Sequence, residues 1–325
     1  MDLRTYQDAV SATDCLPARG GTGLMVQLLG LASEVGELQG EYKKALRDGD
    51  APELYRDRFA EELGDVLWYV ANLATKLGFD LEQIAEQNLV KATDRWGQRA
   101  GLLAPRPDFD EGYPESERLP RTFSVLIKTG IGPGGEPIGQ AYIDGKKLGD
   151  HLTDNAYVRD GYRFHDTFHF AFAAVLGWSP ITRWFLNLKR KSRPEVDVVE
   201  DGARAKAAEE AISLFIFSHA REYNWLEGKA SISSEMLRSV KRMACGLEAS
   251  RCTTSEWEDA IIQGFAAWRF IHNNHGGLLT LDLDRRTITA SRPDDSIASV
   301  LNGDGAGEGY RIRMADADEP TADAE

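Results

Sequence analysis

Two short acidic motifs in the first quarter of the chain have the residue types and the spacing of a metal site. Glu34-Val35-Gly36-Glu37-Leu38 has the order acid, apolar, glycine, acid, apolar, and Glu62-Leu63-Gly64-Asp65-Val66 repeats it. Acids three residues apart are neighbours on one helix surface. Four carboxylates that converge repel one another unless cations neutralise them, and oxygen ligands of this kind suit Mg²⁺. The predicted ligands are Glu34, Glu37, Glu62 and Asp65.

Each motif lies in a stretch with the periodicity of an amphipathic helix. Apolar side chains recur every three or four residues, at Leu28, Leu31, Val35, Leu38, Tyr42 and Ala45 and again at Phe59, Leu63, Val66, Val70, Leu73 and Leu77. In both stretches the acids are offset from the apolar stripe in the same sense. An antiparallel hairpin therefore brings them to the same end of the contact. The alternative is a pair of ordinary surface helices with solvated glutamates, and the matched motifs favour the metal site.

The first hundred residues are predicted to form an all-α bundle. A short first helix, capped by Thr5, precedes predicted helices over 24–46, 53–77 and 81–99. Gly78 is placed to end the third helix and Asp80 to cap the fourth. Short loops between long amphipathic helices favour antiparallel neighbours.

The fourth predicted helix carries a ridge of polar and basic side chains. Asn88, Lys91 and Arg95 follow one another at helical spacing beside the apolar face. Lysine and arginine on one ridge can bind a polyphosphate, lysine as a point charge and arginine as a planar fork. The alternative is a solvated basic edge, and the neighbouring Mg²⁺ site favours the phosphate role.

These motifs resemble a known family. The region from Tyr6 to Arg99 is similar to the MazG-type all-α nucleoside triphosphate pyrophosphatases, whose signature is EExxE, then ExxD, then a lysine and an arginine on the last helix. The first motif here begins with Ser33, which replaces the leading glutamate of the family. Glu41, on the same ridge as Glu34 and Glu37, is the candidate to compensate for that acid.

The resemblance implies an activity and a set of roles. Nucleoside triphosphates would be hydrolysed to the monophosphate and pyrophosphate with Mg²⁺, in a homodimer or homotetramer with sites near subunit interfaces. The metal ligands would be the four acids named above, with phosphate binding at Asn88, Lys91 and Arg95. Glu37 or Glu62 would act as the catalytic base that takes the proton from the attacking water.

Two other hypotheses stay open. In the first hypothesis, which Ser33 motivates, the bundle is a nucleotide sensor that binds without turnover and signals through the second half of the chain. Alternatively, the main active site is a second metal or acid–base site at His165, Asp166 and His169, because the two histidines share a helical face. A later acidic helix adds Glu209 and Glu210 as further candidates for that site. The other interpretation of this cluster is a buried polar network.

The rest of the chain is predicted to be a second, mostly helical α+β domain. The predicted organisation is a bundle over 1–103, a proline-rich linker over 104–120, the second domain over 121–301 and an acidic disordered tail over 302–325. Strands are expected over 122–127 and 140–143, with a closing hairpin over 277–283 and 287–291. The basic run 189–193 is predicted to be a solvated loop, with a phosphate-bearing ligand or RNA as the alternative.

Composition excludes some classes of function. The 325 residues carry a net charge of −14, which argues against a general nucleic-acid-binding protein. A hydrophobic fraction of 42% is that of an ordinary globular chain, and no apolar stretch approaches the length of a membrane span. The three cysteines have no metal-type spacing and cannot all pair, which favours a reducing cytoplasm.

Overall fold

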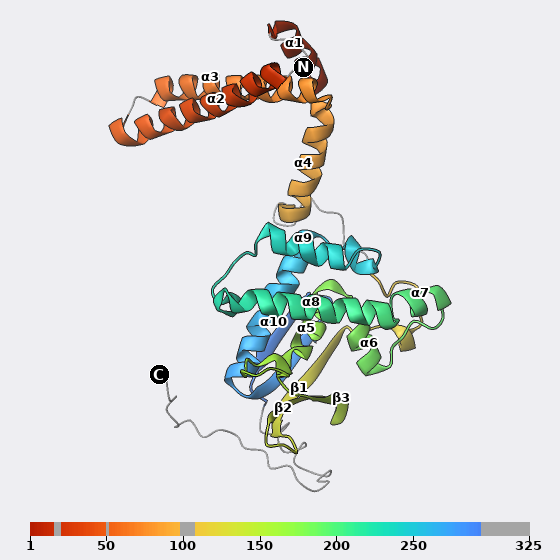
Figure 1. Ribbon diagram of the computed structural model, residues 1–325. Helices are drawn as coiled ribbons and strands as arrows, with labels where there is room; N and C mark the ends of the chain where they lie inside the picture. Colours follow the sequence, from red (N-terminus) through yellow and green to blue (C-terminus); the bar gives the residue numbers. More distant parts are fainter. Residues whose placement is uncertain (16–20, 50–51, 98–107, 294–325) are drawn as a thin grey trace. The chain divides into compact units, whose positions relative to one another are not determined.

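The computed structural model divides the chain into two compact units, residues 1–100 and 101–325 (Figure 1). It describes residues 1–15, 21–49, 52–97 and 108–293. The described part of the first unit is entirely helical, and the second combines helices with a five-stranded sheet. The predicted fold class, mainly α with a helical N-terminal unit and an α+β second unit, is confirmed.

The described residues of the first unit form four helices: α1 Leu3–Thr13, α2 Gly21–Asp48, α3 Pro52–Leu77 and α4 Leu81–Trp96. Gly78, with a φ of 74°, ends α3, and the side chain of Asp80 accepts hydrogen bonds at the start of α4. The predicted cap of the first helix is wrong. The side chain of Asp2 caps α1 by accepting from the backbone N–H of Thr5, because an acid three residues before that N–H reaches it directly.

α2 and α3 pack side by side over their length, as Figure 1 shows. A small buried cluster lies where α1 and α4 meet the second half of α3. It consists of Val10, Ala71, Ala74 and Leu81. Polar contacts close this end of the unit, since Gln7 donates to the carbonyl of Phe79 and accepts from the N–H of Leu81. These contacts hold α1 and the start of α4 against one end of α3.

The second unit is built on an antiparallel sheet with the strand order β3-β2-β1-β4-β5. Its strands are β1 Thr122–Ile131, β2 Pro137–Ile143, β3 Lys146–Leu152, β4 Gly276–Asp282 and β5 Thr287–Ser291. The glycine-rich stretch between β1 and β2 forms a hairpin turn, with Gly135 at a φ of 81°. β1, near the start of the second unit in sequence, thus pairs with β4, near its end, in the middle of the sheet.

Helices complete the second unit. They are α5 Asp166–Ala171, α6 Pro180–Leu186, α7 Pro194–Val199, α8 Ala203–Arg221, α9 Ser234–Met243 and α10 Thr254–Asn273, and a π-helical turn, Phe172–Leu176, continues α5. α10 packs against α5, β4 and β5, and its buried side chains include Trp257, Phe265 and Trp268. α5 is buried over its whole length, so its polar residues must find partners inside the core.

The segment predicted to be a linker packs onto the second unit in its described part, residues 108–120. Phe109, Tyr113 and Leu119 are buried there. Asp110 forms an ion pair with Arg183 of α6, whose guanidinium is also buried. Residues 104–107 and the predicted tail lie outside the described residues.

The predicted solvated loop at 189–193 is wrong at its second position. Arg190 is 1% exposed and forms a two-point ion pair with the buried Asp201. The Lys189 ammonium lies 2.6 Å from the Asp197 carboxylate, and the Arg193 guanidinium lies over the ring of Tyr113. Spacing along the chain does not reveal burial, and two of the four basic side chains in this run already have carboxylate partners.

None of the described helices combines the length and the apolar character that a membrane span requires. The cysteines all lie in the described part of the chain, and none of them forms a disulfide there.

Candidate functional site

The register between α2 and α3 determines which side chains face each other in the first unit. Gly30 of α2 lies against the ring of Tyr69 of α3, and a Cβ on Gly30 would come within 2.2 Å of the Cε1 of Tyr69. Farther along the pair, the carboxylate of Glu41 lies 3.8 Å from the guanidinium of Arg58. The two residue numbers have the same sum in both pairs, as antiparallel helices require.

The same register brings the two acidic motifs to one level of the hairpin, with Glu34 opposite Asp65 and Glu37 opposite Glu62. Glu34, Glu62 and Asp65 each offer a carboxylate oxygen, and these three oxygens all lie within 4.8 Å of one another. Glu34 and Glu62 are half-buried, and Asp65 and Glu37 are exposed. The structure therefore brings acids from both motifs together, and Glu37, the fourth predicted ligand, is not among the three whose oxygens lie this close. We call Glu34, Glu37, Glu62 and Asp65 the acid cluster.

Mutual repulsion is visible in the acid–base properties of the cluster. Partial burial, followed by the charges of Glu37 and Asp65, raises the pKa of Glu34. Partial burial, followed by the charges of Glu37 and Glu34, raises the pKa of Glu62. Glu37 thus acts on carboxylates from both helices. A cation bound among these oxygens would remove the repulsion, and a donor set made only of carboxylate oxygens fits Mg²⁺.

Glu41 does not take the place of the acid that Ser33 replaces. The Nζ of Lys44 lies 2.5 Å from its carboxylate, and Arg58 approaches from α3. Hydrogen bonding from Lys44 lowers the pKa of Glu41, the opposite direction to Glu34 and Glu62. Glu41 is therefore held in an ion-pair network, and the side chain of Ser33 is exposed.

The basic ridge lies on the second half of α4. Asn88 and Lys91 are exposed, and Arg95 is half-buried. Neither Lys91 nor Arg95 contributes to the pKa shift of Glu34 or Glu62. In Figure 1, α4 leaves the end of α3 and runs away from the α2–α3 pair. A single chain does not bring the ridge to the acid cluster.

The apolar face of α4 is open to solvent over much of its length. Leu89 is 66% exposed and Trp96 is 57% exposed, although helical spacing places both on the apolar face. The physical reason is that α4 contacts α1 and α3 through its first turn, and the remaining turns extend beyond them.

A second group of possible metal ligands lies in the second unit, at the start of α5. One ligand atom each from His165, Asp166 and His169 lies within 4.8 Å of the others, and all three residues are buried. The carboxylate of Glu210 on α8 lies 3.5 Å from the Nε2 of His165 and 3.5 Å from the Nε2 of His169. We call these four residues the histidine cluster.

Buried polar partners surround the histidine cluster. The fully buried Glu209 meets the Nδ1 of His169 at 3.0 Å and accepts hydrogen bonds from the hydroxyl of Ser179 and the N–H of Ile181. Although burial alone would lower it, the charge of Glu209 raises the pKa of His169 to about 10. The ring of Tyr162 stacks on His165 with centroids 4.3 Å apart. Burial, with the charges of Glu210 and Asp166, raises the pKa of Tyr162 to about 12.

Sequence reasoning places Glu209 and Glu210 near the histidines but gives no role to Ser179 or Tyr162. Nothing in the sequence marks these two, because their roles come from contacts between α5, α6 and α8. Two other acids, Glu200 and Asp201 just before α8, do not join the histidine cluster. Asp201 pairs with Arg190, and Glu200 accepts from the backbone N–H of Glu248.

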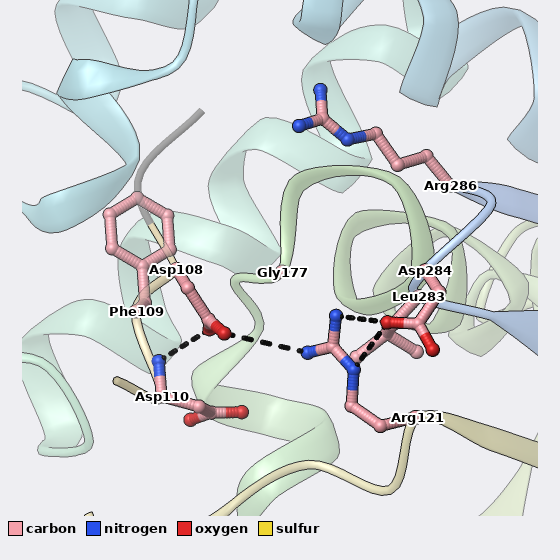
Figure 2. Close-up of a pocket in the computed structure, with 8 residues that line it drawn as sticks. All are labelled: Asp108, Phe109, Asp110, Arg121, Gly177, Leu283, Asp284 and Arg286. Atoms are coloured by element: carbon pink, nitrogen blue, oxygen red, sulfur yellow. Dashed lines mark hydrogen bonds and ion pairs between the residues drawn. The ribbon is translucent and has the colours of Figure 1, made fainter. Parts of the chain in front are cut away.

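A hollow of about 140 Å³ in the second unit is not a good candidate site (Figure 2). Figure 2 shows Arg121 between two of the acids that line the hollow, with its guanidinium 2.6 Å from Asp284 and 3.9 Å from Asp108. Arg286 is paired with Glu256 at 3.0 Å. Both arginines already have carboxylate partners, so the hollow offers little charge to an anionic ligand.

Comparisons with known proteins match both parts of the chain. The model of the MazG nucleotide pyrophosphohydrolase domain matches residues 25–99, which contain the acid cluster, and that of the MazG C-terminal domain matches residues 104–294, which contain the histidine cluster. The chain is also similar to the Gene 37 protein of Mycobacterium phage L5, with 40% identity over 101 residues that cover 29% of this chain and 89% of that protein. No solved structure matches it. The chain therefore belongs to the MazG family, with a nucleotide pyrophosphohydrolase domain followed by a MazG C-terminal domain.

Proposed function

We propose that the protein hydrolyses nucleoside triphosphates to the monophosphate and pyrophosphate at the acid cluster, with Mg²⁺ as the cofactor. One observation carries the proposal: two matched motifs, in a domain of the pyrophosphohydrolase family, place three ligand oxygens within 4.8 Å of one another. The raised pKa values of Glu34 and Glu62 support it, because they reflect carboxylates that a cation would stabilise.

The roles of the side chains follow from their positions. Glu34, Glu62 and Asp65 would hold Mg²⁺, which, when bound, polarises phosphoryl oxygens and lowers the pKa of bound water. Glu37 is exposed beside them, where its carboxylate can take a proton from the attacking water. Glu62 is the alternative base. A metal ligand is less basic than an uncoordinated carboxylate, so the geometry favours Glu37.

The proposal includes assembly as a homodimer or homotetramer, because a single chain leaves large apolar side chains of the first unit exposed. They include Met25, Leu29, Tyr42, Leu46, Leu63, Leu67, Leu89, Val90 and Trp96. Large apolar side chains exposed in such number are typical of a protein that associates. A second copy packed on it would cover these side chains and could bring Asn88, Lys91 and Arg95 to the phosphates of a nucleotide bound at the acid cluster. Lys91 and Arg95 would then stabilise charge on the departing pyrophosphate.

We also include a cytoplasmic location in the proposal, as the cysteine pattern predicts.

The test measures pyrophosphate and monophosphate release by the full chain with Mg²⁺ and a panel of NTPs and dNTPs. We expect turnover by the wild type and its loss, by about 10²-fold or more, in Glu37→Gln and Asp65→Asn. Asp57→Asn on α3 and Glu86→Gln on α4 make the same chemical changes at exposed positions outside the cluster and should keep wild-type rates. Circular dichroism checks that the helices persist.

Retention of turnover in both cluster variants would refute the mechanism. Tight nucleotide binding by the wild type, without product for any member of the panel, would instead support the sensor hypothesis. The loss of an acid at Ser33, which Glu41 does not replace, is the observation that keeps this second candidate open.

A further inference from the structure

We propose that the histidine cluster of the second unit binds a divalent transition-metal ion, through the Nε2 atoms of His165 and His169 and the carboxylates of Asp166 and Glu210. The site lies in the MazG C-terminal domain and is built from ligands different in kind from those of the acid cluster. It does not depend on the proposed hydrolysis of nucleotides.

The two imidazole rings are held in the orientation that metal ligands need. The Nδ1 of His165 lies 2.9 Å from the carbonyl oxygen of Tyr162, which can only accept a hydrogen bond, so this nitrogen carries the proton. The Nδ1 of His169 faces the carboxylate of Glu209 at 3.0 Å in the same way. A bound metal ion takes the place of the proton on the other nitrogen, Nε2, and both Nε2 atoms face the same carboxylate, that of Glu210.

The spacing inside the cluster matches ligands around a small ion better than it matches hydrogen bonds. The two Nε2 atoms lie 3.5 Å from oxygens of Glu210, and that of His165 lies 3.8 Å from Asp166. Good N–H···O hydrogen bonds are about 2.7–3.2 Å long. Ligand atoms about 2.0–2.1 Å from a tetrahedral Zn²⁺ are about 3.4 Å from one another. Only small movements of the side chains would complete such a site.

His169 supplies an independent observation. Its side chain is fully buried, and its Nε2 makes no hydrogen bond of ordinary geometry in the described part of the chain, because its contact with the Glu210 carboxylate is 3.5 Å long. A buried polar atom left without a hydrogen bond costs about 1–3 kcal/mol, so native structures rarely keep one without a reason. An ion bound within the histidine cluster would give the Nε2 of His169 a partner.

The charge and ligand types define the class of ion. Two carboxylates balance the charge of a divalent cation, and two imidazoles favour Zn²⁺, Mn²⁺, Fe²⁺ or Co²⁺ over Mg²⁺ or Ca²⁺. His165, Asp166 and His169 form a buried base at the N-terminal end of α5, whereas the side chain of Glu210 is 47% exposed. The ion would therefore have one side open toward solvent, where water or a small ligand can bind.

The experiment titrates metal-stripped full-length protein with Zn²⁺, Mn²⁺ and Co²⁺ in the presence of excess Mg²⁺, which occupies the acid cluster. Affinity and stoichiometry come from competition with a chromophoric chelator, and Co²⁺ bound to imidazole is followed by its visible absorption. We expect one ion per chain in the second unit. Glu210→Gln should weaken binding at least tenfold, and His165→Gln should abolish it. Glu209→Gln, a change at a positioning residue, should weaken binding about 10- to 100-fold.

Matched controls are His219→Gln, in the last turn of α8, and Glu222→Gln, directly after α8, which change the same residue types outside the cluster and should bind as the wild type does. Glu210 is partly exposed, so its substitution preserves the fold and keeps the test decisive. The proposal is overturned if none of the three ions binds under these conditions, or if Glu210→Gln and His165→Gln keep wild-type affinity. Pyrophosphate release with Mg²⁺ should be unchanged in His165→Gln, which separates this result from the fate of the proposed function.

Discussion

The buried ion pair between Arg190 and Asp201 gives a quantitative test of how the second unit uses its basic run. The Asp201 carboxylate accepts hydrogen bonds from the backbone N–H of Arg190 at 2.7 Å, from its Nε at 3.2 Å and from its Nη2 at 2.9 Å. Both side chains are at most 1% exposed. Asp201→Asn keeps the size of the side chain but removes its charge and directs an NH₂ group at a donor.

The expected cost follows from that burial. Removing one partner of a buried ion pair costs about 3–5 kcal/mol, because the remaining charge stays buried without compensation. Glu248 still contacts Arg190 at 2.8 Å, which places the expected value toward the lower end of the range. With a urea m-value of about 2 kcal/mol/M, the midpoint of unfolding should fall by about 1.5 M.

Asp197→Asn is the matched control. Asp197 pairs with Lys189, the residue next to Arg190, but these two side chains are 26% and 30% exposed. Ion pairs at such positions contribute about 0–1 kcal/mol, so the midpoint should move by less than about 0.5 M.

The assay is urea unfolding of the full chain, followed by the fluorescence of tryptophans that include the buried Trp178, Trp257 and Trp268. Equal shifts in the two variants, or a loss below about 1 kcal/mol in Asp201→Asn, would refute the reasoning that burial sets the strength of these pairs. Such a result would restore the alternative that the basic run is a solvated surface for a phosphate-bearing ligand.

Two further predictions concern the first unit. Gly30→Ala should push α2 away from α3, because the added Cβ would overlap the ring of Tyr69. Mg²⁺ binding, measured by calorimetry, should then weaken at least tenfold. The control is Gly40→Ala, whose Cβ would meet no atom within 4 Å and which should bind Mg²⁺ as the wild type does. A carboxylate whose pKa is raised by folding stabilises the fold only while protonated, so the contribution of Glu34 and Glu62 is present at low pH and lost as pH rises through their raised pKa values. Mg²⁺ should therefore raise the melting temperature at neutral pH. On acidification this stabilisation should disappear at a pH above the ordinary pKa of glutamate, because protons then compete with Mg²⁺ for the carboxylates. Stabilisation by Mg²⁺ that persists below the ordinary pKa of glutamate would contradict this account.

Much of the first unit follows from the sequence. The spacing of Glu34, Glu37, Glu62 and Asp65 predicts two similar helical edges, and the caps at Gly78 and Asp80 lie where glycine and aspartate have conformational or hydrogen-bonding reasons to be. Periodicity fixes which face of a helix a residue occupies, because that depends only on the helical repeat. It also places His165 and His169 together, four residues apart on one face.

What only the tertiary structure decides is which faces meet. The close contact of Gly30 with Tyr69 sets the register that aligns the two acidic motifs, and the packing of α8 on α5 brings Glu210 to the histidines. Burial of Arg190 and exposure of Leu89 both depart from the sequence expectation, since neighbours far apart in the chain determine solvent access. The sequence by itself determined the chemistry that each helix can offer; the contacts between helices decided where that chemistry is concentrated, because attraction and repulsion depend on distances in space that the spacing of residues along one helix does not define.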